Sequence, residues 1–218
     1  MSSLLKYTLY INLESRKDRL NHVQSELSKI GINGQRINAV KTSDGAIGCT
    51  LSHIKCLELA KQRKYPHVFI AEDDITFLDP QALLANLTKF EENPEYMERY
   101  DVLVIGGNNS PPYIDISDYC IRVFNNQTTT GYIVKARYYD TLISNFKESA
   151  QNLMRDPSNR KMFALDIYWK QLQQTAIWLM IIPPTVIQYY DYSDIEKRVV
   201  DYTPLMLDMK KEWLFGKR

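Results

Sequence analysis

The chain has 218 residues, of which 44% are hydrophobic and 24% are charged, which is enough for one domain with a substantial core. Its net charge of +1 gives no overall field that would attract nucleic acid, and no apolar run approaches the length of a membrane span. The three cysteines, Cys49, Cys56 and Cys120, have no paired spacing and no zinc pattern, and free thiols are typical of a reducing cytosol. We therefore expect one cytoplasmic domain without a nucleic-acid partner.

The first predicted elements are a strand at residues 7–13 and a helix that ends at Gly31. Ser15 and Asp18 form an S-x-x-D capping pattern at the start of this helix. Polar groups cluster at the turn between the two elements, where they can hold a nucleotide base or phosphates. These residues are Asn12, Arg16, Lys17 and Arg19. A solvated helix face would explain the same charges, so the cluster alone does not decide the function.

A short strand at residues 35–40 and a glycine-containing turn, Gly45 to Gly48, come next. A glycine turn in front of a helix lets the backbone approach a phosphate or a sugar, although a simple loop is the plainer interpretation. His53 lies on the helix that follows, and a histidine in that setting is more often a core or capping residue than a ligand.

The stretch from Val68 to Asp74 carries the strongest chemical signal in the chain. Its apolar first part suits a strand buried on both faces, and three carboxylates, Glu72, Asp73 and Asp74, follow at the end of that strand. Ligands of open α/β sheets bind at this end of the strands, and three adjacent acids repel one another unless a cation lies between them. Mg²⁺ and Mn²⁺ take oxygen ligands, commonly carboxylates together with substrate phosphates. The triplet therefore predicts a metal–diphosphate site with Asp74 as a direct ligand; the alternative is a polar loop or a helix cap.

The second half of the chain continues to alternate between strands and helices, with Asp79 and Pro80 opening the first helix as N-cap and N1. We expect helices near 80–90, 135–146 and 163–172, strands at 101–107, 121–124, 131–134 and 175–182, and connections at 108–118 and 151–160. This alternation indicates an α/β fold with a Rossmann-like nucleotide-binding half. The sequence has no G-x-G-x-x-G motif, no P-loop and no G-x-S-x-G motif, which disfavours dinucleotide oxidoreductases, P-loop NTPases and hydrolases with a nucleophile elbow.

The tail from Leu205 to Arg218 mixes apolar residues with lysine and arginine. A helix docked on the core is the favoured interpretation. The alternative is a basic amphipathic segment that makes weak peripheral contact with the inner face of an anionic membrane.

Several of these stretches together resemble glycosyltransferase family 25, the lipopolysaccharide and lipooligosaccharide glycosyltransferases related to the procollagen galactosyltransferases. The matching parts are residues 10–13, 16–19, 45–53, 68–74 and 131–134, the segment around Asp166, and Gln188 with 193–195. The resemblance implies a GT-A-like fold with a mixed, mostly parallel central sheet flanked by helices. It divides the single domain, 1–218, into a nucleotide-sugar half at about 1–107, an acceptor half at about 108–204 and a tail at 205–218.

The resemblance also implies inverting transfer of a sugar, most often galactose, from a UDP-sugar donor, with Mn²⁺ or Mg²⁺ as cofactor. The expected acceptor is a glycan or a lipid-linked oligosaccharide of lipopolysaccharide or related glycan synthesis. The chain departs from the family at Ala46, where a glutamate is common, and it has no histidine beyond His67 to serve as a late metal ligand. Asp191 or Asp194 would replace that ligand, or the diphosphate and water would complete the shell.

Three groups of site residues follow from the patterns and the resemblance together. The expected donor-binding residues are Asn12, Leu13, Arg16, Arg19, Ala39, Val40, Gly48, Glu72, Asp73, Gln188 and Ser193. The expected metal ligands are Asp74 and Glu72, and the expected acceptor-binding residues are Thr130, Gly131, Tyr132 and Trp169.

The predicted catalytic base is Asp166, which is the one acid in the apolar segment 162–169. Packing would hold its carboxylate in place, and partial burial would raise its pKa and its basicity. Asp191 and Asp194 are the alternative bases.

Two other functions remain open. Glu72-x-Asp74-x-Thr76 imitates the D-x-D-x-T motif of haloacid-dehalogenase-type phosphatases, but those enzymes need an aspartate nucleophile at the first position. A non-catalytic nucleotide-sugar-binding protein would carry the same acids in a structural role.

Overall fold

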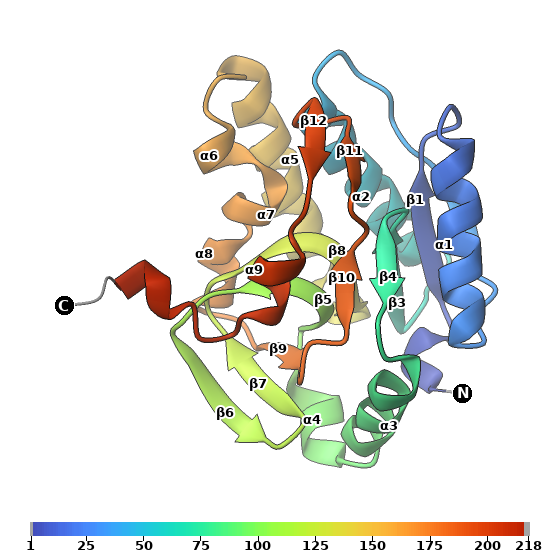
Figure 1. Ribbon diagram of the computed structural model, residues 1–218, viewed down its shortest axis with the longest axis vertical. Coiled ribbons are helices and arrows are strands. Elements are labelled where there is room, and N and C mark those ends of the chain that lie inside the picture. Colours follow the sequence, from blue (N-terminus) through green and yellow to red (C-terminus); the bar gives the residue numbers. More distant parts are fainter. Residues whose placement is uncertain (1, 216–218) are drawn as a thin grey trace.

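The computed structural model describes residues 2–215 and is built around one eight-stranded sheet (Figure 1). The order of its strands is β2-β1-β3-β8-β5-β9-β7-β6. Their bounds are β1 Thr8–Asn12, β2 Gln35–Asn38, β3 His67–Glu72, β5 Val102–Asn109, β6 Tyr113–Ser117, β7 Cys120–Val123, β8 Asn126–Lys135 and β9 Trp178–Ile181. Strands β7 and β8 run against the other six, so the sheet is mixed and mostly parallel, as expected.

Two hydrophobic clusters cover the two faces of this sheet because successive strand residues point to opposite sides. Val68 and Ile70 of β3 belong to the cluster that contains α2 (Gly45–Gln62) and α5 (Tyr139–Arg155), whereas Phe69 and Ala71 belong to the cluster that contains α1 (Lys17–Lys29) and α3 (Pro80–Glu91). The helices are α1 Lys17–Lys29, α2 Gly45–Gln62, α3 Pro80–Glu91, α4 Pro94–Arg99, α5 Tyr139–Arg155, α6 Arg160–Phe163, α7 Leu165–Tyr168, α8 Lys170–Gln173 and α9 Thr203–Leu207. Short 3₁₀ helices lie at η1 Ser3–Leu5, η2 Ala136–Tyr138 and η3 Glu212–Phe215. The expected α/β fold is confirmed.

Two antiparallel strand pairs stand outside the main sheet and were not predicted. β4, Ile75–Phe77, pairs with β10, Val186–Gln188, and β11, Asp191–Ser193, pairs with β12, Arg198–Val200. Figure 1 shows the β11–β12 pair, in orange-red, above β10 and α9, with β10 beside β4. Pairing between distant or very short segments leaves little periodic signal in the sequence, which explains why these strands were missed.

The predicted helix ends were partly right. Asp79 caps α3 by accepting a hydrogen bond from the Ala82 N–H, and Gly31 has a positive φ of 72° just after α1, as a helix stop requires. Ser15 does not cap α1: the N-cap is Arg16, which makes no side-chain capping bond. The predicted turn at Gly45 is instead the first turn of α2, because Asp44 caps that helix by accepting from the Ala46 N–H.

The second half also differs from the prediction in extent. The expected helix at 135–146 continues to Arg155, so the start of the predicted connection at 151–160 is helical. The expected loop at 108–118 contains the end of β5 and all of β6. None of the helices within residues 2–215 has the length and apolar character needed to cross a membrane.

The tail is docked as far as the structure describes it. Met206 of α9 is buried, and the Lys211 ammonium donates to the carbonyl of Asn109 in β5. Trp213 and Leu214 remain half-exposed. The predicted basic residues Lys217 and Arg218 lie outside the described residues.

Candidate functional site

A pocket of about 370 Å³ lies where β1, β2 and β3 end. Parallel neighbours end at the same edge of a sheet, so Asn12 at the end of β1 and Glu72 at the end of β3 face one space. Every predicted donor-binding residue lines this pocket, as do Asp74 and Asp194. A volume of this size is typical of small-molecule sites.

Two arginines from the turn after β1 and the first turns of α1 form one wall of the pocket. Arg16 contacts Asp191 through Nη2 at 2.6 Å and Asp194 through Nη1 at 2.8 Å. Arg19 contacts Asp191 through Nε at 3.1 Å, and it also donates to the carbonyl of Tyr192 at 3.0 Å. The N-terminal turn therefore holds the β11–β12 hairpin through charge-assisted hydrogen bonds.

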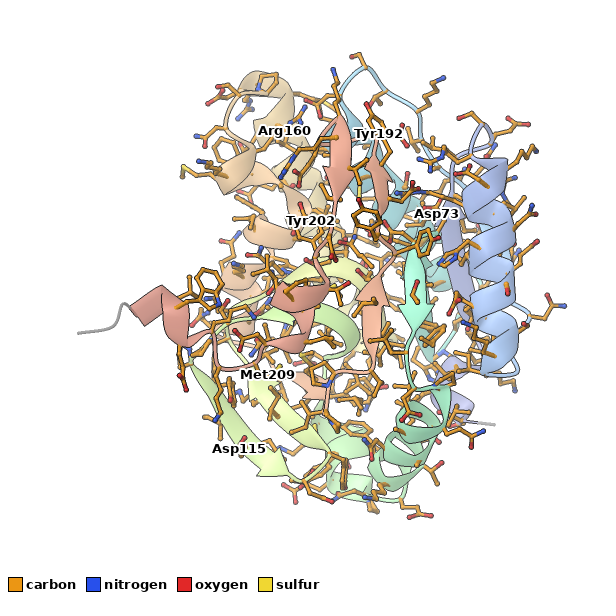
Figure 2. The ribbon with its side chains drawn as sticks, in the orientation of Figure 1. Asp73, Asp115, Arg160, Tyr192, Tyr202 and Met209 are labelled. Carbon is orange, nitrogen blue, oxygen red and sulfur yellow. The ribbon has the colours of Figure 1, made fainter. Side chains whose placement is uncertain are left out.

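The other side of the hairpin is held by Arg160 of α6. Its guanidinium contacts Asp44 at 2.8 Å and donates to the carbonyl of Ile195 at 3.1 Å. Figure 2 labels Arg160 on one side of the hairpin and Asp73 on the other, with Tyr192 on the hairpin itself. The hairpin thus forms a wall of the pocket that spans between α6 and α1.

The backbones of Val40 and of Gly48 in α2 pack closely together in another wall of the pocket. A Cβ added to Gly48 would lie 2.5 Å from the Val40 carbonyl oxygen, so only glycine fits at this point of α2.

Arg19 also supplies the cation that the neighbouring acids need. One of its Nη atoms lies 3.2 Å from a carboxylate oxygen of Asp73 and 3.2 Å from one of Asp74. Asp73 is further held by the Asn12 amide, which donates to it at 2.7 Å. In this structure a guanidinium therefore lies between the carboxylates of Asp73 and Asp74.

Asp74 keeps one buried carboxylate oxygen, Oδ1, without a hydrogen-bond partner among the described residues. Burial and the nearby negative charge of Glu72 raise the pKa of Asp74 to about 8. A buried acid with an unused oxygen at a strand end can accept a cation, since a bound ion would supply the missing contact.

Glu72 lies at the centre of a hydrogen-bond network. Its Oε1 accepts from the Thr129 hydroxyl at 2.6 Å and lies 3.1 Å from His53 Nε2 and 3.7 Å from Cys49 Sγ. Burial opposes the charge of Glu72, but the hydrogen bond and charge of His53 outweigh it, so the pKa of Glu72 is lowered. Gln188 approaches the second oxygen at 3.4 Å.

Thr128 and Thr129, near the start of β8, connect Glu72 with Asp166. Thr129 donates to Glu72, and the Thr128 N–H donates to the Asp166 carboxylate at 3.1 Å. Thr128 has a φ of 75°, which is strained for a β-branched residue and costs about 1–3 kcal/mol. Such strain persists where the surroundings force it, often at functional sites.

Asp166 lies on α7 as expected, but it is not among the residues that line the pocket. Burial raises its pKa, which the Thr128 N–H partly offsets. Burial raises the pKa of the Cys49 thiol, and the negative charges of Glu72 and Asp166 raise it further. Asp191, by contrast, has a lowered pKa: burial opposes its charge, but hydrogen bonds from the Tyr192 backbone, Arg19 and Arg16 outweigh it.

The predicted acceptor-binding residues do not reach the pocket. Thr130, Tyr132 and Trp169 are fully buried, and Gly131 lies between strands β3 and β5 in the sheet. The Trp169 indole donates to the Asn126 carbonyl inside the core. Trp169, expected to bind the acceptor, exposes no ring face in this structure, because its ring fills the core between α5 and β8.

Sequence reasoning missed several site residues. Cys49 and His53 are four positions apart on α2, which places them on one helical face and was a usable signal. Asp44, Arg160 and Thr129 carried no signal, because their partners are far away in the sequence.

The sequence was compared with known families and relatives. The family described as glycosyltransferase family 25 (LPS biosynthesis protein) matches residues 41–158. A Drosophila pseudoobscura pseudoobscura protein named glycosyltransferase 25 family member is 25% identical over 162 residues, which cover 60% of this chain and 26% of that protein. The chain thus spans about a quarter of the length of that relative.

Solved structures with a similar backbone fold were also found. A mannose-1-phosphate geranyltransferase from Thermus thermophilus has a TM-score of 0.46 at 11% identity and covers 84% of this chain and 74% of its own. A glycosyltransferase involved in glycosylation of the major capsid of PBCV-1 has a TM-score of 0.41 at 8% identity. The match covers 81% of this chain and 91% of that protein. The sheet topology, rather than these matches, carries the assignment of the fold.

Proposed function

Because the chain belongs to glycosyltransferase family 25, we propose that it transfers a sugar from a UDP-sugar donor to a hydroxyl group of a glycan acceptor. The observation that carries the proposal is the pocket at the ends of β1, β2 and β3, in which Arg19 contacts Asp73 and Asp74 and Arg16 lies beside it.

The arginines account for the diphosphate of the donor. A guanidinium forms paired hydrogen bonds with phosphate oxygens, and Arg16 and Arg19 already bind a carboxylate oxygen of Asp191. In the proposed complex the diphosphate takes over part of these contacts. Asn12, Leu13, Ala39 and Val40 line the adjoining wall, which suits the uridine.

A divalent cation, Mn²⁺ or Mg²⁺, fits the acids that are present. Asp74 offers a buried oxygen without a hydrogen-bond partner among residues 2–215, and burial together with the charge of Glu72 raises its pKa. A bound divalent ion supplies Lewis-acid stabilisation of the charge on a leaving diphosphate. In this proposal Asp74 holds the ion and Glu72 supports it.

Asp166 is the proposed base for inverting transfer. Its raised pKa gives it proton affinity, and Thr128 holds its carboxylate in place. The strained Thr128–Thr129 segment fixes Asp166 relative to Glu72, so the acceptor hydroxyl would lie on that side of the donor. Asp191 and Asp194 are weaker candidates because both are paired with Arg16.

The family description supports an acceptor in lipopolysaccharide or related glycan synthesis, and galactose is the sugar that the family resemblance favours. A lipid-linked oligosaccharide would place the enzyme at the cytoplasmic face of the inner membrane.

The phosphatase alternative fits the site poorly. Its nucleophile would be Glu72, but Oε1 of Glu72 is engaged by Thr129, His53 and Cys49. A binding protein without turnover is the remaining alternative, and only an assay separates it from a transferase.

The test is incubation of the purified chain with a panel of UDP-sugars and Mn²⁺, with release of UDP measured with and without glycan acceptors. Release that depends on one sugar and on Mn²⁺ and is lost in Asp74→Asn supports the proposal. Saturable UDP binding without release in any combination would favour a binding protein, and phosphate release from monoesters would favour a phosphatase.

A further inference from the structure

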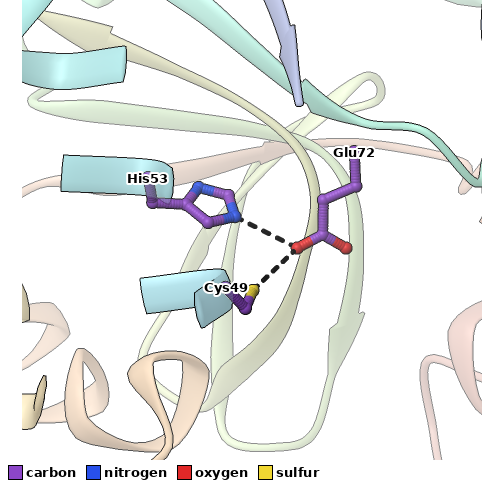
Figure 3. A group of neighbouring side chains, drawn as sticks. All are labelled: Cys49, His53 and Glu72. Carbon is purple, nitrogen blue, oxygen red and sulfur yellow. Dashed lines mark hydrogen bonds and ion pairs between the residues drawn. The ribbon is translucent and has the colours of Figure 1, made fainter. Parts of the chain in front are cut away.

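Cys49, His53 and Glu72 bring three different ligand atoms together at the floor of the pocket (Figure 3). Cys49 Sγ, His53 Nε2 and one Glu72 oxygen all lie within 4.8 Å of one another. The same three residues line the pocket. From this geometry we infer a Zn²⁺ site with three protein ligands and a fourth position that faces the pocket.

The three ligands are carried by rigid elements. Cys49 and His53 are four residues apart on α2, so both side chains project from one face of an 18-residue helix. Glu72 is the last residue of β3, the strand against which α2 packs. No loop has to rearrange to bring the atoms together.

The chemistry of the ligands favours zinc over the ion proposed for transfer. A thiolate, an imidazole and a carboxylate form a mixed sulfur, nitrogen and oxygen set, which suits Zn²⁺ in an open tetrahedral site. Mn²⁺ and Mg²⁺ prefer oxygen ligands only, as Asp74 would provide. The inferred site therefore differs from the Asp74 position in selectivity, although both use Glu72.

Neighbouring side chains already orient the ligands. His53 Nδ1 lies 2.7 Å from the Tyr132 hydroxyl, and both side chains are fully buried. When Nε2 binds the ion, the imidazole proton is on Nδ1, and this N–H donates a hydrogen bond to the Tyr132 hydroxyl oxygen. The Thr129 hydroxyl donates to Glu72 at 2.6 Å and holds the carboxylate in the same way. Hydrogen bonds of this kind support the ligands in metal sites of proteins.

Proton balance follows from the present contacts. The thiol proton of Cys49 leaves to solvent when sulfur binds the ion. A charged His53 loses its Nε2 proton to solvent as well, and the bound imidazole keeps one proton, on Nδ1. The carboxylate of Glu72 needs no proton change. Binding of one Zn²⁺ therefore releases one proton from the thiol.

Occupation of this site would withdraw Glu72 from its supporting role beside Asp74. This consequence, unlike binding itself, rests on the proposed function: Zn²⁺ is then an inhibitor of Mn²⁺-supported transfer.

The test is a titration of the purified full chain with Co²⁺, which takes zinc sites and reports on its ligands by absorption. We expect a thiolate-to-cobalt charge-transfer band with visible bands of a tetrahedral ion, both displaced by Zn²⁺. Cys49→Ser should remove the charge-transfer band and weaken Zn²⁺ binding by calorimetry at least about 100-fold, since loss of even an outer partner costs about 10–100-fold. Cys56→Ser on the same helix is the matched control. It should keep the band, because Cys56 is buried in the core and is not one of the three ligands.

Absence of the band in the wild-type chain, or its survival in Cys49→Ser, overturns the inference; circular dichroism of each variant confirms that it is folded. His53→Gln gives a second check, because it should weaken binding while the thiolate band remains at saturation. Zinc binding without any sugar transfer would leave the inference standing and refute the proposed function. Transfer that is insensitive to Zn²⁺ in a chain that binds it would refute the inhibitory consequence.

Discussion

Arg16 and Asp191 form an ion pair across 175 positions of the chain, with Nη2 2.6 Å from Oδ2. Both side chains are largely shielded, with 17% and 28% of their surface exposed. This pair joins the turn after β1 to the β11–β12 hairpin that walls the pocket. A diphosphate that binds Arg16 must compete with Asp191. Arg16 should therefore strengthen donor binding, whereas Asp191 should weaken it.

Arg16→Ala should weaken UDP binding about 10-fold or more, because hydrogen bonds to a charged group contribute about 1.5–3 kcal/mol. Calorimetric titration with UDP measures the effect. Lys17→Ala is the control, since Lys17 is exposed and does not line the pocket. Equal affinities of the wild type and Arg16→Ala would place the diphosphate elsewhere.

Asp191→Asn should tighten UDP binding, by several-fold, because the neutral amide competes less well for Arg16 and Arg19. If Asp191 were the base instead, kcat would collapse while affinity changed little. Measuring the dissociation constant and kcat on the same preparation separates the two outcomes.

Asp74→Asn should lower metal-dependent turnover at least ~100-fold, because loss of a metal ligand forfeits several kcal/mol of charge stabilisation. Initial rates of UDP release at increasing Mn²⁺ measure this. Asp115→Asn, an exposed change on β6, is the control. Turnover that survives both Asp74→Asn and a chelator would show that the reaction needs no metal at Asp74.

Asp166→Asn should reduce kcat severely and leave UDP affinity nearly unchanged. The amide oxygen can still accept from the Thr128 N–H, so the change removes the charge and preserves the hydrogen bond. In the wild type, kcat should rise with pH as Asp166 ionises, and this acidic limb should be absent in the variant. Should Asp194→Asn lose activity while Asp166→Asn keeps it, the role of base passes to Asp194.

The same substitution has an effect on stability with a defined sign. Burial raises the pKa of Asp166 above its ordinary 3.8, so the folded state binds this proton more tightly than the unfolded state. Its favourable contribution is therefore complete below pH 3.8 and is lost as pH rises through the raised pKa. Asp166→Asn lacks this titration, and its melting temperature relative to wild type should increase over that range. Parallel melting curves against pH would contradict the assigned burial of this charge.

The half-exposed Trp213 and Leu214 allow a test of membrane contact. If the tail contributes, the chain should bind weakly to vesicles with anionic lipids, and Trp213→Ala with Leu214→Ala should reduce the bound fraction in sedimentation. Leu78→Ala, a half-exposed leucine before α3, is the control. Equal binding of wild type and double variant to anionic and neutral vesicles would remove the tail from consideration.

Local chemistry made much of the site predictable. Asn12 and Glu72 follow apolar runs that can only be buried strands, and parallel strands end together, so their meeting at one edge followed from the pattern. Arg19 lies one helical turn after Arg16, which placed both on the same wall. Asp79 before Pro80 and Gly31 after α1 were predictable because caps depend on neighbouring residues only.

Long-range geometry decided the rest. Trp169 and Tyr132 have the composition of a sugar platform, yet both fill the core, because the face that an apolar residue presents depends on what packs against it. The Arg16–Asp191 pair required the fold of the β11–β12 hairpin, and the use of Arg19 as the cation between Asp73 and Asp74 required the angle at which α1 leaves β1. Residue types and spacing thus determined which chemical groups reach the pocket, whereas tertiary packing determined their partners, since contacts across many residues leave no local periodicity to read.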